Sequence, residues 1–154
     1  RRGHPDVDKI FPVARLREAV RNADHVVAVV PGGPDTRHLF NARVFLAMKR
    51  DACFYTASRG SVVDEPALIA ALRRGHVGGA GMDDFAHEPL PRSSPLWTLK
   101  NVIVSPHSAG LSVRLADRLC DHFCANLQRY SRGEPFADKI DLSSYASVNL
   151  ISQT

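Results

Sequence analysis

The sequence predicts an α/β fold, a doubly wound parallel sheet, on two observations. Short apolar runs of the strand type, at residues 25–30, 52–57, 78–82 and 102–104, alternate with segments of helical periodicity. Polar residues follow these runs, at the position where an open parallel sheet holds its ligand chemistry, outside the carboxyl ends of the strands.

The N-terminal third predicts one helix and one strand. Val13, Leu16 and Val20 have helical spacing within residues 12–22, and the proline at the start suits a first helical turn. Residues 25–30 are a nearly continuous apolar run, which is typical of a parallel strand buried on both faces. We therefore expect helix, then strand, then a turn at Pro31-Gly32-Gly33-Pro34 that no helix would tolerate.

Capping residues mark two further helices. Asn41 is suited to cap a helix over residues 42–49, and Asp64 is suited to cap one over residues 65–74. Gly75 then supplies the stop signal of the second helix. The strand predicted at residues 52–57 lies between them and leads directly into Arg59 and Gly60.

The remaining chain predicts a glycine-rich strand, a long loop and one long helix. Glycines in the strand at residues 78–82 indicate close approach by another backbone or by a cofactor. Residues 84–100 form a proline-containing loop of a length that is often functional. Residues 112–132 predict a helix with one apolar stripe. Cys120 and Cys124 share a face that could hold half a metal site, but no second pair accompanies them, so we expect packing.

Composition indicates one globular domain. The chain has 154 residues, of which 44% are hydrophobic and 23% charged, enough for one ordinary core. No apolar run approaches the roughly 20 residues that cross a bilayer, so we expect no membrane partner. Three cysteines do not imply a paired disulfide framework, and a reduced cytoplasmic setting is the simpler expectation.

Basic charge is concentrated in the first third of the chain. The net charge is +4, and residues 1–50 hold ten Lys and Arg against five Asp and Glu, while residues 51–154 hold ten against eleven. Nucleic-acid binding is one explanation of such an excess. The basic residues, however, have no aromatic stacking platform beside them. An anionic cofactor and substrate, or solubility, explain the charge equally well, and we expect no nucleic-acid partner.

Arg59, Glu88 and His107 form a set with specific chemistry. A planar guanidinium binds a carboxylate through two parallel hydrogen bonds. A histidine transfers a proton near neutral pH, and a carboxylate at its second ring nitrogen sets its tautomer. The three together suit the reduction of a 2-keto acid, with a cofactor as the source of hydride because no side chain donates one. Each residue alone would more often be a surface group or a structural ion pair.

The other histidines carry no comparable pattern. His87 lies beside Glu88 and is interpreted as a loop residue. The remaining five show no ligand spacing with one another, so surface or core positions are expected and no metal site is predicted: His4, His25, His38, His76 and His122.

Several ordered motifs resemble the D-isomer-specific 2-hydroxyacid dehydrogenases, and among them most the glyoxylate/hydroxypyruvate reductase branch. The resemblance covers roughly residues 1–135 in unbroken order. The motifs that carry it are Ser58-Arg59-Gly60 with Val63-Asp64-Glu65, Gly79-Ala80-Gly81-Met82-Asp83-Asp84-Phe85, Glu88-Pro89-Leu90, Ser94-Pro95-Leu96-Trp97 and Asn101-Val102-Ile103-Val104-Ser105-Pro106-His107.

The resemblance implies a Rossmann-like fold and a role for each site residue. Arg59 would bind the substrate carboxylate, His107 would be the acid/base, Glu88 would be its partner, and Asp83 would face the nicotinamide carboxamide. Arg1 and Arg2 would lie near the adenosine ribose, where arginines favour the 2′-phosphate of NADP over NAD, although a solvated basic terminus is the alternative. The implied cofactor-binding set is Arg1, Arg2, Pro31, Thr36, Ala57, Ser58, Arg59, Asp83, His107 and Ala109.

The resemblance also implies a domain organisation. Residues 1–134 would be part of an NAD(P)-binding domain, and residues 135–154 would be a tail that returns to a substrate domain. The glycine-rich first βα unit, the substrate domain and the homodimer interface are all expected upstream of Arg1. Two other interpretations stay open: a dinucleotide-sensing interaction module of the corepressor type, and an inactive fragment.

Overall fold

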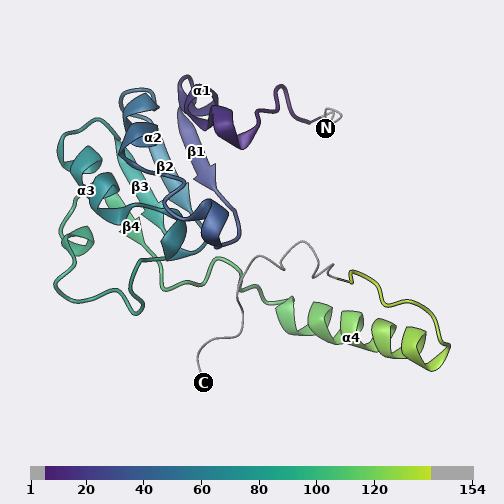
Figure 1. Cartoon of the computed structure of the whole chain (residues 1–154). Helices are drawn as coiled ribbons and strands as arrows, with labels where there is room; N and C mark the ends of the chain where they lie inside the picture. The colour runs from purple at the N-terminus through teal and green to yellow at the C-terminus, as the bar shows by residue number, and fades with distance from the viewer. Residues whose placement is uncertain (1–5, 140–154) are drawn as a thin grey trace. The chain divides into compact units, whose positions relative to one another are not determined.

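The structure is a computed structural model that describes residues 6–139. The chain divides into two compact units, Arg1–Ala109 and Gly110–Thr154. The described elements of the first unit alternate between helix and strand along the chain, and the second unit contains one long helix (Figure 1).

Four parallel strands form one sheet in the first unit. Their order in the sheet is their order in the sequence: β1 (His25–Ala28), β2 (Cys53–Thr56), β3 (Gly79–Met82) and β4 (Val102–Val104). Ala28, Thr56, Met82 and Val104, the last residues of the four strands, pair in one row across the sheet. The four following loops therefore all begin at the same edge. The predicted parallel, Rossmann-like α/β fold is confirmed.

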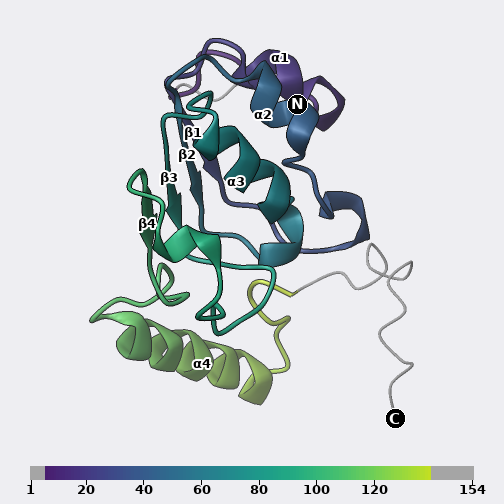
Figure 2. The same ribbon diagram turned by 90° about the vertical axis from the view of Figure 1, so that its left-hand side faces the viewer.

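Three helices pack on one face of this sheet (Figure 2): α1 (Leu16–Val20), α2 (Ala42–Ala47) and α3 (Glu65–Arg73). Phe54 of β2 is fully buried beneath them, with the rings of Phe40 and Phe45 at 5.1 and 5.2 Å from its own. Such aromatic clusters contribute a large share of core stability. The core holds the strands, and with them the loops at their carboxyl ends, in fixed positions.

The predicted helix caps are confirmed. The Asn41 side chain accepts hydrogen bonds from the Arg43 and Val44 amides at the start of α2, and the Asp64 side chain accepts one from the Ala67 amide at the start of α3. Gly75 has φ of +64°, the left-handed conformation that ends many helices. Local sequence alone was sufficient to locate these helix ends, because a cap acts within one turn.

The predicted helix over residues 12–22 is shorter in the structure. A 3₁₀ turn, η1 (Val13–Arg15), precedes the single-turn helix α1, and Arg15 lies outside helical geometry with φ of −104° and ψ of 21°. Val13 is 68% exposed, so it does not continue the apolar face that Leu16 and Val20 present to the core. The apolar spacing thus predicted the core-facing positions Leu16 and Val20 correctly and Val13 wrongly.

The expectation that residues 25–30 form a strand buried on both faces is wrong for this unit. Residues along β1 alternate between exposed and buried, with Val27 63% exposed, and Ile103 of β4 is 77% exposed. The physical reason is that the described helices of the first unit pack on one face only. A continuous apolar run in the sequence therefore did not indicate whether helices cover one face of the sheet or both.

Two short 3₁₀ turns interrupt segments that we expected to be loops. Pro34 begins η2 (Pro34–Thr36), where its missing amide hydrogen removes no bond, and Pro95 begins η4 (Pro95–Trp97) in the same way.

The glycine-rich strand does allow close backbone approach, because a Cβ on Gly78 would lie 2.4 Å from the Asp51 carbonyl oxygen.

The second unit contains α4 (Leu115–Ser131), which ends at Gly133 with φ of +69°. None of its residues is buried, and both Cys120 and Cys124 are exposed, so the packing expected for these cysteines is not found within the second unit. None of the helices among residues 6–139 has the length and apolar character that crossing a membrane requires.

Candidate active site

The predicted site residues follow the carboxyl ends of the four strands. Pro31 follows β1, Ser58 and Arg59 follow β2, Asp83 directly follows β3, and His107 follows β4. Since the strand ends form one row, these residues come to one edge of the sheet, all within the first unit. This edge is where open α/β folds bind their ligands.

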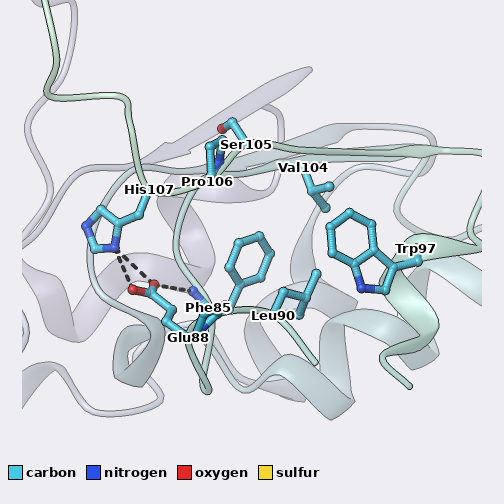
Figure 3. A pocket seen from close by; sticks show the side chains of 9 residues that line it. Phe85, Glu88, Leu90, Trp97, Val104, Ser105, Pro106 and His107 are labelled. Atoms are coloured by element: carbon cyan, nitrogen blue, oxygen red, sulfur yellow. Dashed lines mark hydrogen bonds and ion pairs between the residues drawn. The ribbon is translucent and has the colours of Figure 1, made fainter. Parts of the chain in front are cut away.

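Glu88 and His107 form a hydrogen-bonded pair. The Nδ1 atom of His107 lies 2.8 Å from Glu88 Oε2 and 3.0 Å from Oε1, and Oε1 also accepts a hydrogen bond of 3.0 Å from the Phe85 amide (Figure 3). Both side chains are a little more than one-third exposed. The loop after β3 therefore places the Glu88 carboxylate beside His107, which follows β4.

Charge at Glu88 fixes the tautomer of His107. The hydrogen bond with His107, and then that from the Phe85 amide, hold the pKa of Glu88 below its ordinary value. An ionised carboxylate only accepts hydrogen bonds, so Nδ1 of His107 carries hydrogen and donates it. The second ring nitrogen, Nε2, points away from Glu88 (Figure 3) and is the atom at which the ring exchanges a proton.

His107 has a backbone conformation that side chains rarely adopt. Its φ is +53°, in the left-handed region, which costs about 1 kcal/mol for a residue other than glycine. The following backbone is anchored, because the Ser108 and Ala109 amides donate to the Asp83 carboxylate at 2.9 and 2.8 Å. Asp83 thus holds the turn that presents His107.

The Asp83 carboxylate is buried and well supplied with donors. Burial is the largest influence and raises its pKa, but hydrogen bonds from the Ser105 hydroxyl, at 2.6 Å, and from the Ala109 and Ser108 amides outweigh it together, so the pKa of Asp83 is lowered. A carboxylate offers about four acceptor positions, so three donors leave room for one more. Contact with a carboxamide stays a prediction.

The segment before Arg59 is bonded to β1 and to residues that follow β1 and β3. The Ser58 hydroxyl donates to the Ala28 carbonyl at 2.9 Å and accepts from the Val30 amide at 3.0 Å, and the Ser58 amide donates to Asp84 Oδ2 at 2.6 Å. Ala57 is exposed beside it, and its amide donates to the Ala28 carbonyl at 3.0 Å.

Arg59 itself is exposed and oriented by its own backbone. One guanidinium nitrogen, Nη1, donates to the Ser58 carbonyl at 2.6 Å. Within residues 6–139, none of the ion pairs includes Arg59, although its charge contributes to the lowered pKa of Glu88. A guanidinium has five donors, so the side chain retains the capacity to bind a carboxylate.

The turn after β1 is closed by its own threonine. The Thr36 hydroxyl lies 2.8 Å from the Pro31 carbonyl and 3.2 Å from the Gly33 carbonyl. Gly32 packs against the next loop, where an added Cβ would lie 3.0 Å from Cβ and Cγ of Arg59. The predicted residues Pro31 and Thr36 thus belong to one turn, which contacts the Arg59 segment.

An apolar cavity of about 560 Å³ lies beside the His107–Glu88 pair. Phe85, Leu90, Trp97 and Val104 form most of its wall (Figure 3). It lies on the Glu88 side of the imidazole ring, whereas Nε2 points away from it. The cavity thus adjoins the Glu88 carboxylate and not the Nε2 atom of His107.

Two predicted residues lie outside the described part of the chain, and some contributors to the site were missed. Arg1 and Arg2 lie outside the described residues. Asp84 was not singled out, although a second carboxylate directly after an apolar strand was a usable signal. The Phe85 amide, as a backbone group, had no sequence signal at all.

Metal-ligand geometry is not present in the described part of the chain. Among residues 6–139, no group of three or more His, Cys, Asp or Glu side chains could hold a metal ion. His25 instead lies 3.1 Å from the Tyr55 hydroxyl on the exposed face of the sheet.

Comparison with known proteins identifies the family. Residues 2–109 match the family model described as D-isomer specific 2-hydroxyacid dehydrogenase, NAD binding domain. Glyoxylate/hydroxypyruvate reductase B of Klebsiella pneumoniae strain 342 is 46% identical over 109 residues, which are 70% of this chain and 34% of that protein. The chain therefore spans about a third of the length of the curated relatives it matches.

Solved structures give the same result. A probable 2-hydroxyacid dehydrogenase from Rhizobium etli CFN 42, in complex with NADP, HEPES and L(+)-tartaric acid, superposes with a TM-score of 0.81 at 32% identity, covering 94% of this chain and 46% of that one. An NADPH-dependent glyoxylate/hydroxypyruvate reductase from Sinorhizobium meliloti, in complex with NADP and sulfate, has a TM-score of 0.78 at 32% identity, covering 85% and 42%. This chain belongs to the D-isomer-specific 2-hydroxyacid dehydrogenase family, and residues 2–109 match the NAD-binding domain of that family.

Proposed function

We propose that this chain is the cofactor-binding part of an NAD(P)-dependent reductase of small 2-keto acids of the glyoxylate or hydroxypyruvate type. The observation that carries the proposal is the His107–Glu88 pair, at 2.8 Å, on the same sheet edge as an arginine without an ion-pair partner among residues 6–139. The names of the relatives support the same substrate class.

The residues at the sheet edge fit a dinucleotide. The ends of four parallel strands supply an open edge, and the turn after β1 is exposed at Gly32, which lets the turn lie directly against the Arg59 side chain. When bound there, NAD(P)H supplies the hydride. Pro31 and Thr36 would lie on its adenine side, and Ala57, Ser58, Asp83 and Ala109 would line its path toward His107.

Arg59 would bind and orient the substrate. Its guanidinium would hold the carboxylate through paired hydrogen bonds and place the neighbouring carbonyl at His107. The positive charge would also stabilise negative charge as it develops on the carbonyl oxygen. Binding of the anion and stabilisation of the reacting oxygen would thus come from the same side chain.

His107 would donate the proton. Nε2 carries it to the carbonyl oxygen as the alkoxide forms, while Nδ1 stays bonded to Glu88. Glu88, whose pKa is held below its ordinary value, accepts the Nδ1 hydrogen bond and keeps the orientation of the ring before and after transfer. In the reverse direction the neutral ring would accept the proton of a D-2-hydroxy acid.

NADP is the proposed cofactor, with NAD as the alternative. The family model is that of an NAD-binding domain, and the two solved relatives described above contain NADP. Arg1 and Arg2 remain the proposed contacts of the 2′-phosphate.

The organisation of the complete protein is also part of the proposal. We propose that residues 1–134 belong to the cofactor-binding domain and that residues 135–154 return to a substrate domain. The complete protein would act in the cytoplasm as a homodimer, with a small 2-keto or 2-hydroxy acid, and neither nucleic acid nor membrane, as its partner.

Oxidation of NADPH and NADH with glyoxylate and hydroxypyruvate tests the proposal, on this chain and on a version extended upstream to the length of its relatives. We expect turnover in the extended protein and its loss in His107→Ala, with dinucleotide binding retained. His87→Ala, one residue from Glu88, is the matched histidine control and should keep activity. Dinucleotide binding without turnover in the extended wild type would contradict the reductase and favour a dinucleotide sensor.

A further inference from the structure

Asp84 is a buried carboxylate that the proposed reaction does not use. It is 1% exposed, and its Oδ2 atom accepts hydrogen bonds from the Ser58 amide at 2.6 Å and the Thr56 hydroxyl at 2.8 Å. Its Oδ1 atom is buried without a hydrogen-bond partner among the described residues. Burying a carboxylate is costly, so its retention here calls for a role that an apolar side chain would not serve.

The bonds of Asp84 end on the segment that precedes Arg59. Thr56 is the last residue of β2, and Ser58 directly precedes the arginine; both are buried, at 3% and 4% exposure. The Ser58 carbonyl in turn accepts the 2.6 Å hydrogen bond from Nη1 of Arg59. Asp84 thus holds the amide of Ser58, the residue whose carbonyl orients the guanidinium.

Asp83 and Asp84 together anchor the two sides of the site. Adjacent residues after a strand point in opposite directions, and here Asp83 bonds the turn of His107 while Asp84 bonds the segment of Arg59. The end of β3 is therefore the common support for the two side chains that would contact the substrate.

We infer that Asp84 is a positioning residue for Arg59, acting through its hydrogen bond with the Ser58 amide; this rests on the proposed function. Without the carboxylate, the Ser58 amide would have no acceptor at this position. The Ser58 carbonyl, to which the Arg59 guanidinium is bonded, would then no longer be held in place. Displacements of about 1 Å in a substrate-binding group cost up to a hundredfold in catalysis. Dinucleotide contacts on the other loops do not depend on this bond.

The kinetic test uses the extended protein with glyoxylate and NADPH. Asp84→Ala should raise KM for glyoxylate by about tenfold or more, with the dissociation constant of NADPH changed less than about threefold. Asp84→Asn retains an oxygen for both donors and should return KM to within about threefold of wild type. Leu72→Ala, a buried change at the far end of α3, controls for general destabilisation and should leave KM unchanged. A folded Asp84→Ala variant with wild-type KM would overturn the inference.

A second measurement uses the 154-residue chain and requires no turnover. A hydrogen bond to a charged acceptor is the stronger kind, so the Ser58 amide proton should resonate downfield in wild type and move upfield in Asp84→Asn. The amide of Ala67, bonded to Asp64 on another element, is the internal reference and should not move. An unchanged Ser58 resonance would overturn the inference, even if the extended protein proved not to reduce glyoxylate.

Discussion

Gly60 lies at the tightest contact between the Arg59 segment and the loop that carries Glu88. A Cβ at this position would lie 1.7 Å from the Phe85 carbonyl oxygen and 2.0 Å from its carbon. Real Cβ atoms approach no closer than 3.0 Å, so Gly60→Ala requires a movement of 3.0 − 1.7 = 1.3 Å. Because the obstacle is backbone, no side-chain rotation relieves the clash.

We expect Gly60→Ala to destabilise the first unit by about 3 kcal/mol, the upper part of the range for overpacked sites. With a urea m-value of about 2 kcal/mol/M, the unfolding midpoint should fall by about 1.5 M. The single tryptophan, Trp97, lies in the first unit, so its fluorescence reports on that unit. Unfolding of the 154-residue chain in urea is therefore the assay.

Gly33→Ala is the matched control. Its Cβ would lie 3.9 Å from the Thr36 hydroxyl, an ordinary contact, and its φ of 177° is an extended conformation that any residue adopts. This variant should stay within about 0.5 kcal/mol of wild type. Equal midpoints for the two variants would refute the argument that the Gly60 contact holds the Arg59 segment against the loop of Glu88.

Three further predictions concern charge, a helix cap and catalysis. The pKa of Asp83 is lowered from 3.8 in the folded chain, so its charge stabilises the fold above about pH 4, and this contribution disappears as pH falls through the lowered value. The difference in unfolding free energy between wild type and Asp83→Asn should therefore be largest near neutral pH and shrink in acid; a difference independent of pH would contradict this. Asn41→Ala removes the acceptor for two amides of α2 and should cost about 1 kcal/mol in urea unfolding, while Arg43→Ala, beside it and exposed, should cost less than about 0.5 kcal/mol. In the extended protein, Glu88→Gln should lower kcat by about tenfold to a hundredfold with little change in dinucleotide affinity, since catalysis by a positioned acid is worth about 10² to 10⁴ in rate; an unchanged kcat would show that the pair is not used.

Local sequence was enough to predict the elements whose determinants act over a few residues. Asn41 and Asp64 cap the helices that they were expected to cap, and Gly75 takes the left-handed conformation after α3. The four strands follow from short apolar runs, and the polar residues after them come to one edge of the sheet, where the proposed site lies. Alternating strands and helices leave little choice but a parallel sheet.

Tertiary structure decided the contacts between loops distant in the sequence. Glu88 and His107 are 19 residues apart, and only the pairing of β3 with β4 brings them to 2.8 Å. Asp84 reaches Ser58 across 26 residues because β2 and β3 pair side by side.

Burial likewise depended on which faces are covered rather than on the apolar character of a segment. Val27 and Phe54 both lie in apolar strands, yet one is 63% exposed and the other fully buried. A sequence specifies which side chains of a strand lie on the same face of the sheet. Which of the two faces the helices cover is decided only when the chain folds. The residues of the proposed site, Arg59, Glu88 and His107, were singled out from the sequence alone; the carboxylates and backbone amides that hold them in place required the structure.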